Sequence, residues 1–102
     1  MDLSKLMKQA QQMQKDIKKV EDELNASIYE GAAQSGAVKC SVNGLNQVTS
    51  FYVEEELLEK DNKEVLEDLI MLAVNEATKK AKEDRDAKMN NVAGGMKIPG
   101  LG

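Results

Sequence analysis

An apolar residue recurs at alternating spacings of three and four through the first 24 residues. The positions in this seam are Leu3, Leu6, Ala10, Met13, Ile17, Val20 and Leu24. Heptad spacing of this kind predicts an amphipathic helix, from about Asp2 to Asn25, whose seam packs against another helix. Neither Gly nor Pro interrupts the segment, and its many Gln, Lys, Met and Leu residues favour a helix.

From Ser27 to Val53 the apolar period changes to two, which predicts three short strands. Their expected ranges are 27–31, 38–42 and 47–53, with a small-residue loop at 32–36. Alternation places Val38, Cys40 and Val42 on one face of the second strand. In the third strand, it places Phe51 and Val53 on one face and Val48 and Tyr52 on the other.

The Asn43-Gly44 pair predicts a tight turn between the second and third strands, because both residue types tolerate positive φ. The three strands then form an antiparallel meander. A second helix is expected from a capping box at Asp61-Asn62-Lys63-Glu64 to about Asn90. Its buried stripe is predicted to consist of Leu66, Leu69, Ile70, Ala73, Ala77 and Ala81, widened by Val65, Leu72 and Val74.

Beyond Ala81 the apolar stripe ends while the helical composition continues, which predicts a helix end that projects from the globular part. The sequence therefore predicts an α+β fold with the order α-β-β-β-α and projecting terminal helices. One domain is expected over residues 1–93, followed by a flexible tail over 94–102. Because aromatic residues are few, the core is small, and a homodimer is expected to complete it.

The net charge of −4 is unevenly distributed. Residues 1–20 carry five lysines against two acids, and residues 79–102 carry five lysines and Arg85 against three acids. The acidic residues dominate the middle of the chain. This asymmetry matters more for the choice of partner than the total charge does.

Several classes of function are not expected from the composition. The chain has no histidine and a single cysteine, Cys40, which argues against disulfides, zinc sites and histidine-based catalysis. Cys40 alternates with valines and is expected in the core. Three consecutive glutamates, 54–56, do not converge on one face, so no metal site is expected. We expect no enzyme, no cofactor, no small-molecule substrate and no membrane span, and a cytoplasmic protein.

The candidate functional residues are basic and lie in two clusters. In the first helix they occupy heptad positions b, c and f, away from the seam, and no acid shares that face before Asp22. The first cluster is Lys5, Lys8, Lys15, Lys18 and Lys19. The second cluster is Lys79, Lys80, Lys82, Arg85 and Lys88. Acidic residues are interspersed in the second cluster. If the start of the first helix lies near the end of the second helix, as in a projecting antiparallel pair, the two clusters merge at the tip of that pair. The plainer interpretation is a solvated, solubilising helix face.

Several segments resemble the YbaB/EbfC family of small bacterial nucleoid-associated proteins. They are residues 6–14, Val42-Asn43-Gly44 with a following strand that ends in Val53, Leu66-Glu67-Asp68-Leu69, and Gly94-Gly95-Met96. The resemblance implies a homodimer whose paired helices project like tweezers from a central sheet. It also implies DNA binding that alters DNA conformation, with roles in nucleoid organisation and gene regulation. The family offers no catalytic residues.

Charge pattern and resemblance together predict a nucleoid protein that binds double-stranded DNA through phosphate contacts. The first helix has no arginine, so bidentate guanine recognition is not expected there and sequence specificity should be low. The alternative is a protein-interaction module in which the seam docks another helical protein. RNA binding is a third possibility, because A-form duplexes also attract cationic helices.

Overall fold

The computed structural model describes residues 2–94, and within them the predicted α-β-β-β-α order is confirmed. The helices and strands are α1 (Leu3–Ala26), β1 (Ile28–Ala33), β2 (Val38–Asn43), β3 (Val48–Val53) and α2 (Lys63–Gly94). Three short 3-10 turns, Gln34–Gly36, Glu55–Leu57 and Lys60–Asn62, connect them. The predicted tail is outside the described residues except for Gly94, which is the last residue of α2.

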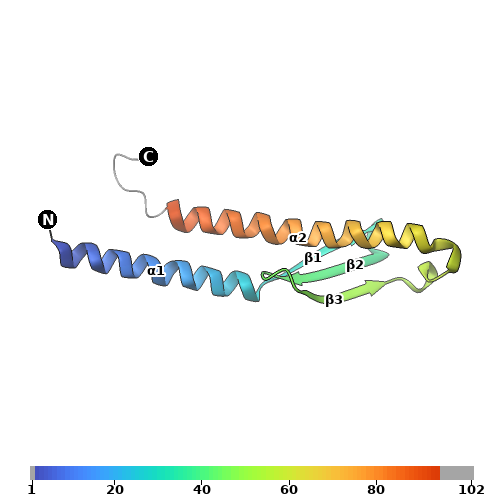
Figure 1. Ribbon diagram of the computed structural model, residues 1–102, viewed down its shortest axis with the longest axis horizontal. Coiled ribbons are helices and arrows are strands. Elements are labelled where there is room, and N and C mark those ends of the chain that lie inside the picture. The colour runs from blue at the N-terminus through green and yellow to red at the C-terminus, as the bar shows by residue number, and fades with distance from the viewer. Residues whose placement is uncertain (1, 95–102) are drawn as a thin grey trace.

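The sheet is the predicted antiparallel meander, with strand order β1-β2-β3 (Figure 1). Cys40 pairs with Gly31 on one side and with Phe51 on the other, so these residues share one face. The prediction that Val48 lies on the face of Tyr52 is wrong. A register shift between Ser41 and Val42 pairs Val42 with Val48, which moves Val48 to the opposite face.

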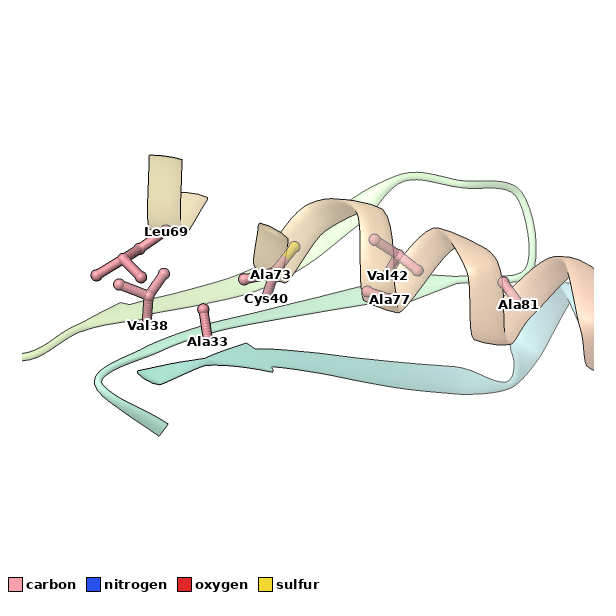
Figure 2. Close-up of a cluster of buried hydrophobic side chains, with 8 residues drawn as sticks. All are labelled: Ala33, Val38, Cys40, Val42, Leu69, Ala73, Ala77 and Ala81. Atoms are coloured by element: carbon pink, nitrogen blue, oxygen red, sulfur yellow. The ribbon is translucent and has the colours of Figure 1, made fainter. Parts of the chain in front are cut away.

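Helix α2 packs across one face of the sheet and forms the core with it (Figure 2). The prediction for β2 is confirmed, since Val38, Cys40 and Val42 are fully buried under α2. Burial also raises the pKa of the Cys40 thiol, so this side chain is a neutral core residue. From α2, the buried residues are Leu69, Ala73, Ala77 and Ala81, while Leu66, Ile70 and Val74 are half-buried. The prediction that Val65 and Leu72 widen the buried stripe is wrong, because both are exposed, outside the part of α2 that the sheet covers. Small side chains on α2 let the helix lie close to the sheet.

Two turn predictions are wrong in detail. The small-residue loop begins later than expected, because Ala33 still pairs in β1 and the positive φ angles fall at Gln34 and Ser35. At the β2–β3 turn neither Asn43 nor Gly44 has a positive φ. Instead the Asn43 side chain organises the turn by accepting hydrogen bonds from the backbone N–H groups of Leu45 (2.9 Å) and Gln47 (3.0 Å).

Helix α2 also differs from its predicted limits. Asp61 was expected to cap the helix, but it lies inside a 3-10 turn, and the α-helix begins two residues later at Lys63. The helix ends at Gly94, four residues beyond the predicted end.

The molecule is elongated, with extents of 72 × 24 × 16 Å, because α1 points away from the sheet. The last part of α2 leaves the sheet and lies antiparallel beside α1, and α1 extends beyond the last described residue of α2 (Figure 1). The residues of the predicted α1 seam are buried only where α2 lies beside α1. Leu24 is buried, Met13, Ile17 and Val20 are half-buried, and the first seam residues, Leu3 and Leu6, are exposed. We call α1, together with the part of α2 beside it, the arm.

Candidate nucleic-acid interface

All five lysines of the first cluster are exposed along α1. Within residues 2–94, Lys5, Lys8, Lys15 and Lys19 form no ion pair. Lys18 lies 3.4 Å from Asp22, one helical turn away, with both side chains exposed. An exposed pair of this kind contributes little and breaks easily when a stronger anion approaches. The outer face of α1 therefore carries four lysines without an ion pair, Lys5, Lys8, Lys15 and Lys19, which we call the uncompensated lysines.

Three of the four lysines of the second cluster form ion pairs with acids one helical turn away. Lys79 lies 3.9 Å from Glu83, and Lys88 lies 3.1 Å from Asp84. Lys80 pairs with Glu76 at 3.2 Å and also donates a hydrogen bond to the Glu30 carbonyl at 2.8 Å. Among the described residues, Lys82 is the lysine of this cluster without an ion pair.

Arg85 connects three elements where the arm meets the sheet, a region that we call the root of the arm. Its Nη2 donates to Asn25 Oδ1 at the end of α1 (2.7 Å) and to the Gly44 carbonyl in the β2–β3 turn (2.9 Å). Gly44 is needed there because a Cβ at this position would overlap the Leu24 carbonyl. These contacts fix the direction in which α1 leaves the sheet.

The prediction that the two clusters merge at the tip of the arm is wrong. Lys80 contacts β1 and Arg85 contacts the β2–β3 turn, so the second cluster begins over the sheet and ends at the root. Among the described residues, α1 extends beyond the end of α2 (Figure 1), and Lys5 and Lys8 belong to the first two turns of α1. The acidic segment at residues 54–68 lies at the opposite end of the long axis. Charge is therefore separated along the molecule, with the uncompensated lysines on the projecting arm.

A second contact at the root joins Tyr29 of β1 to α2. The Tyr29 hydroxyl donates to Asp84 Oδ2 at 2.7 Å, and Lys88 Nζ donates to the same oxygen at 3.1 Å. The hydrogen bond from Tyr29, assisted by the one from Lys88, lowers the pKa of Asp84. Burial, with Asp84 as the next cause, raises the pKa of Tyr29. This contact was not predicted, because Tyr29 and Asp84 are 55 residues apart.

Tyr29→Phe should lower the free energy of unfolding at pH 7 by about 1–2 kcal/mol, because a hydrogen bond to a charged, part-buried carboxylate is lost. Since the pKa of Asp84 is lowered in the folded state, its contribution is present above the unfolded value, near pH 4, and is lost as pH falls through the folded value. The difference from the unsubstituted protein should therefore shrink between pH 7 and about pH 3. Urea unfolding at both pH values measures it.

Tyr52→Phe is the matched control, because Tyr52 is 52% exposed and its hydroxyl makes no hydrogen bond within the described chain. An equal loss in both variants would show that the Tyr29–Asp84 bond is not the cause.

Residues 2–94 contain neither a metal-binding cluster nor a membrane-spanning helix. No group of His, Cys, Asp and Glu side chains there could hold a metal ion. Neither helix of that range is long and apolar enough to span a membrane.

Comparison with known proteins decides the family. The model of the YbaB/EbfC DNA-binding family matches residues 1–96, nearly the whole chain. The chain belongs to this family. The resemblance inferred from the sequence is thus confirmed.

Relatives of similar length support the YbaB/EbfC assignment. A nucleoid-associated protein of Pelotomaculum thermopropionicum is 42% identical over 99 residues, covering 97% of this chain and 94% of the relative. One from Chloroflexus aurantiacus is 39% identical over 97 residues, covering 95% of this chain and 97% of the relative. The crystal structure of an uncharacterized Helicobacter pylori protein superposes with a TM-score of 0.76 at 27% identity, covering 91% of this chain and 98% of that one.

Proposed function

We propose that this YbaB/EbfC protein is a nucleoid-associated protein that binds double-stranded DNA with low sequence specificity through the lysines of its arm. The observation that carries the proposal is the row of uncompensated lysines on α1, at the end of the molecule opposite its acidic segment. The family description and the names of the relatives support a DNA partner. Bacterial nucleoid proteins act in the cytoplasm, which fits this assignment.

The mechanism is electrostatic. Each lysine that contacts a phosphate displaces condensed counterions, and this release supplies affinity without reading base sequence. Lys5 and Lys19 are separated by 14 residues of continuous helix, about 21 Å, so α1 can contact several phosphates along one strand. The acidic end of the molecule is repelled by DNA and orients the arm toward it.

A second copy of the chain supplies a second arm in this proposal. β3 is an edge strand with one unpaired side in the described chain. Cys40 is fully buried under α2, but its cross-strand partner Phe51 is 42% exposed. The cover that α2 provides therefore stops between β2 and β3. β3 therefore has an open edge and, beside it, an apolar side chain that α2 does not cover. A second β3 fits this edge, which would give a two-fold dimer.

Phe51→Glu should convert the dimer to a monomer, because each copy would bring a carboxylate into the apolar β3–β3 contact. Light scattering coupled to size-exclusion chromatography measures the mass. Ile28→Glu is the control, since Ile28 is 58% exposed but lies on the other edge strand. A Phe51→Glu protein that remains dimeric, or an Ile28→Glu protein that becomes monomeric, would contradict this interface.

Equilibrium binding to different nucleic acids tests the proposed function. Two duplex DNAs of unrelated sequence should bind with similar affinity, and both should compete better than a duplex RNA of the same length. Energy transfer between dyes at the two DNA ends would report a change in DNA conformation. The proposal fails if neither DNA binds. It also fails in its specificity if one sequence is strongly preferred.

The alternative function, docking of another helical protein on the α1 seam, has less support from the structure. Met13, Ile17 and Val20 are half-buried and Leu24 is buried, so this half of the seam already packs within the chain. Ile17→Glu discriminates the two functions. Loss of a complex with another protein, with DNA binding and the homodimer intact, would favour the alternative.

A further inference from the structure

A groove lies at the root of the arm, between the β2–β3 turn and α2. Its volume is about 500 Å³. The polar residues that line it are Asn46, Asn75, Thr78, Lys79, Lys82 and Arg85. We call it the root groove. None of the α1 lysines lines it, so it is separate from the row of charges proposed above to contact DNA.

The charged side chains that line the root groove are all basic. The lining contains three basic side chains and two side-chain amides, and no carboxylate is among the lining residues. Lys82 has no ion-pair partner among residues 2–94, and the partner of Lys79, Glu83, is 3.9 Å away. The Thr78 hydroxyl donates to carbonyls of its own helix (Val74 and Asn75, both 3.1 Å). Its proton is therefore already used, and Thr78 lines the groove without donating to a ligand. An anion with acceptor oxygens complements these basic side chains and amide N–H donors.

Arg85 is held ready for such an anion. Both of its hydrogen bonds, to Asn25 and to the Gly44 carbonyl, come from Nη2. They fix the guanidinium plane at the wall of the groove, and a fixed planar fork loses little entropy when it binds an oxyanion. The half-buried position of Arg85 also reduces screening by water compared with the lysines of α1.

We propose that the root groove binds a backbone phosphate of the DNA that the arm contacts. This inference rests on the proposed function and deepens it. The α1 lysines then contact the duplex along the arm, and the root groove holds one phosphate where the arm meets the sheet. The contact at the root groove would fix the position of the duplex along the length of the arm.

Two measurements on the full chain test the root groove. The first is a ¹⁵N NMR titration with tripolyphosphate and, separately, with a short duplex. Both should shift the backbone amides of Asn46, Thr78 and Lys82. The second is duplex affinity across a salt series for the double variant Lys79→Gln/Lys82→Gln. Loss of the contact with the one phosphate held there should reduce the slope of log affinity against log salt by about 1 and weaken binding by roughly 8-fold near 100 mM salt.

Lys60→Gln/Lys63→Gln is the matched control, because it removes the same charge at the acidic end of the molecule. If the groove double variant binds duplex like this control while α1 variants lose binding, the root groove proposal is overturned and the proposed function stands. If tripolyphosphate shifts the groove amides but no duplex binds, the groove takes free phosphates. That result overturns both the DNA assignment of the groove and the proposed function. Chemical-shift changes confined to the amides of α1 would also overturn the root groove proposal.

Discussion

Replacing Lys5, Lys8 and Lys15 together with glutamine should weaken duplex DNA binding by two to three orders of magnitude near 100 mM salt. Each lysine is exposed on α1 and has no ion pair within residues 2–94. Each phosphate contact contributes a slope of about 0.9 to the salt dependence, so three lost contacts reduce affinity by roughly 500-fold at that ionic strength. The helix propensity of glutamine is close to that of lysine, so α1 should remain folded.

The control for this variant removes three lysines from elsewhere. Lys39→Gln/Lys60→Gln/Lys63→Gln lowers the net charge equally, but these residues lie in β2 and near the start of α2. Fluorescence anisotropy with one labelled duplex compares both variants with the unsubstituted protein. If both lose affinity equally, total charge rather than the α1 row governs binding. If the α1 variant binds normally, the lysine row is solvated surface.

Gly31→Ala should destabilise the fold by about 3 kcal/mol, the upper end of the range for overpacked cores. A Cβ at Gly31 would overlap the Ala73 carbonyl and the Ala77 backbone N–H, and both belong to the backbone of α2. The helix cannot relieve this overlap by rotating a side chain, so it must move off β1. That movement would also disturb the packing around Cys40, the cross-strand partner of Gly31. Since a domain of this size has a total stability of about 5–15 kcal/mol, the loss is large.

Gly94→Ala is the control for this prediction. Nothing lies within 4 Å of a Cβ built at Gly94, and alanine favours a helix more than glycine does. Urea unfolding followed by circular dichroism should show a lower midpoint for Gly31→Ala and an unchanged or higher one for Gly94→Ala. A Gly31→Ala protein as stable as the unsubstituted chain would show that α2 does not approach β1 as closely as described.

The sequence predicted the element order and the core because both follow from local periodicity. Alternation in Val38-Lys39-Cys40 identified the buried face of β2, and the spacing of Leu69, Ala73, Ala77 and Ala81 identified the buried stripe of α2. Such patterns reflect which side of a helix or strand faces solvent, and this can be inferred from residues close together in the sequence.

Features that depend on contacts between distant segments were not predicted. The tight-turn interpretation of Asn43-Gly44 failed because Gly44 is required by the close approach of Leu24, not by its φ angle. Arg85 was placed in the basic cluster, but its bonds to Asn25 and Gly44 depend on where three elements meet. One signal was available, because Arg85 is the single arginine among the lysines of that cluster.

The site was predicted less fully than the fold for the same reason. Heptad positions identified the outward face in the second half of α1, where Met13, Ile17, Val20 and Leu24 are the less exposed side, since these positions depend on one helix alone. Whether the second cluster lies at the tip or the root depends on how α2 is aligned with α1 and the sheet. Spacing within either helix does not contain that information. The root groove also forms only when the β2–β3 turn meets α2.

The most direct test of the central claim is the affinity of the unsubstituted protein for duplex DNA across roughly 50 to 200 mM salt, measured by fluorescence anisotropy. Two duplexes of unrelated sequence should be compared. The electrostatic account predicts a steep linear fall of log affinity with log salt and nearly the same slope for both duplexes. Absence of binding at the lowest salt, or an affinity that hardly changes with salt, would contradict it.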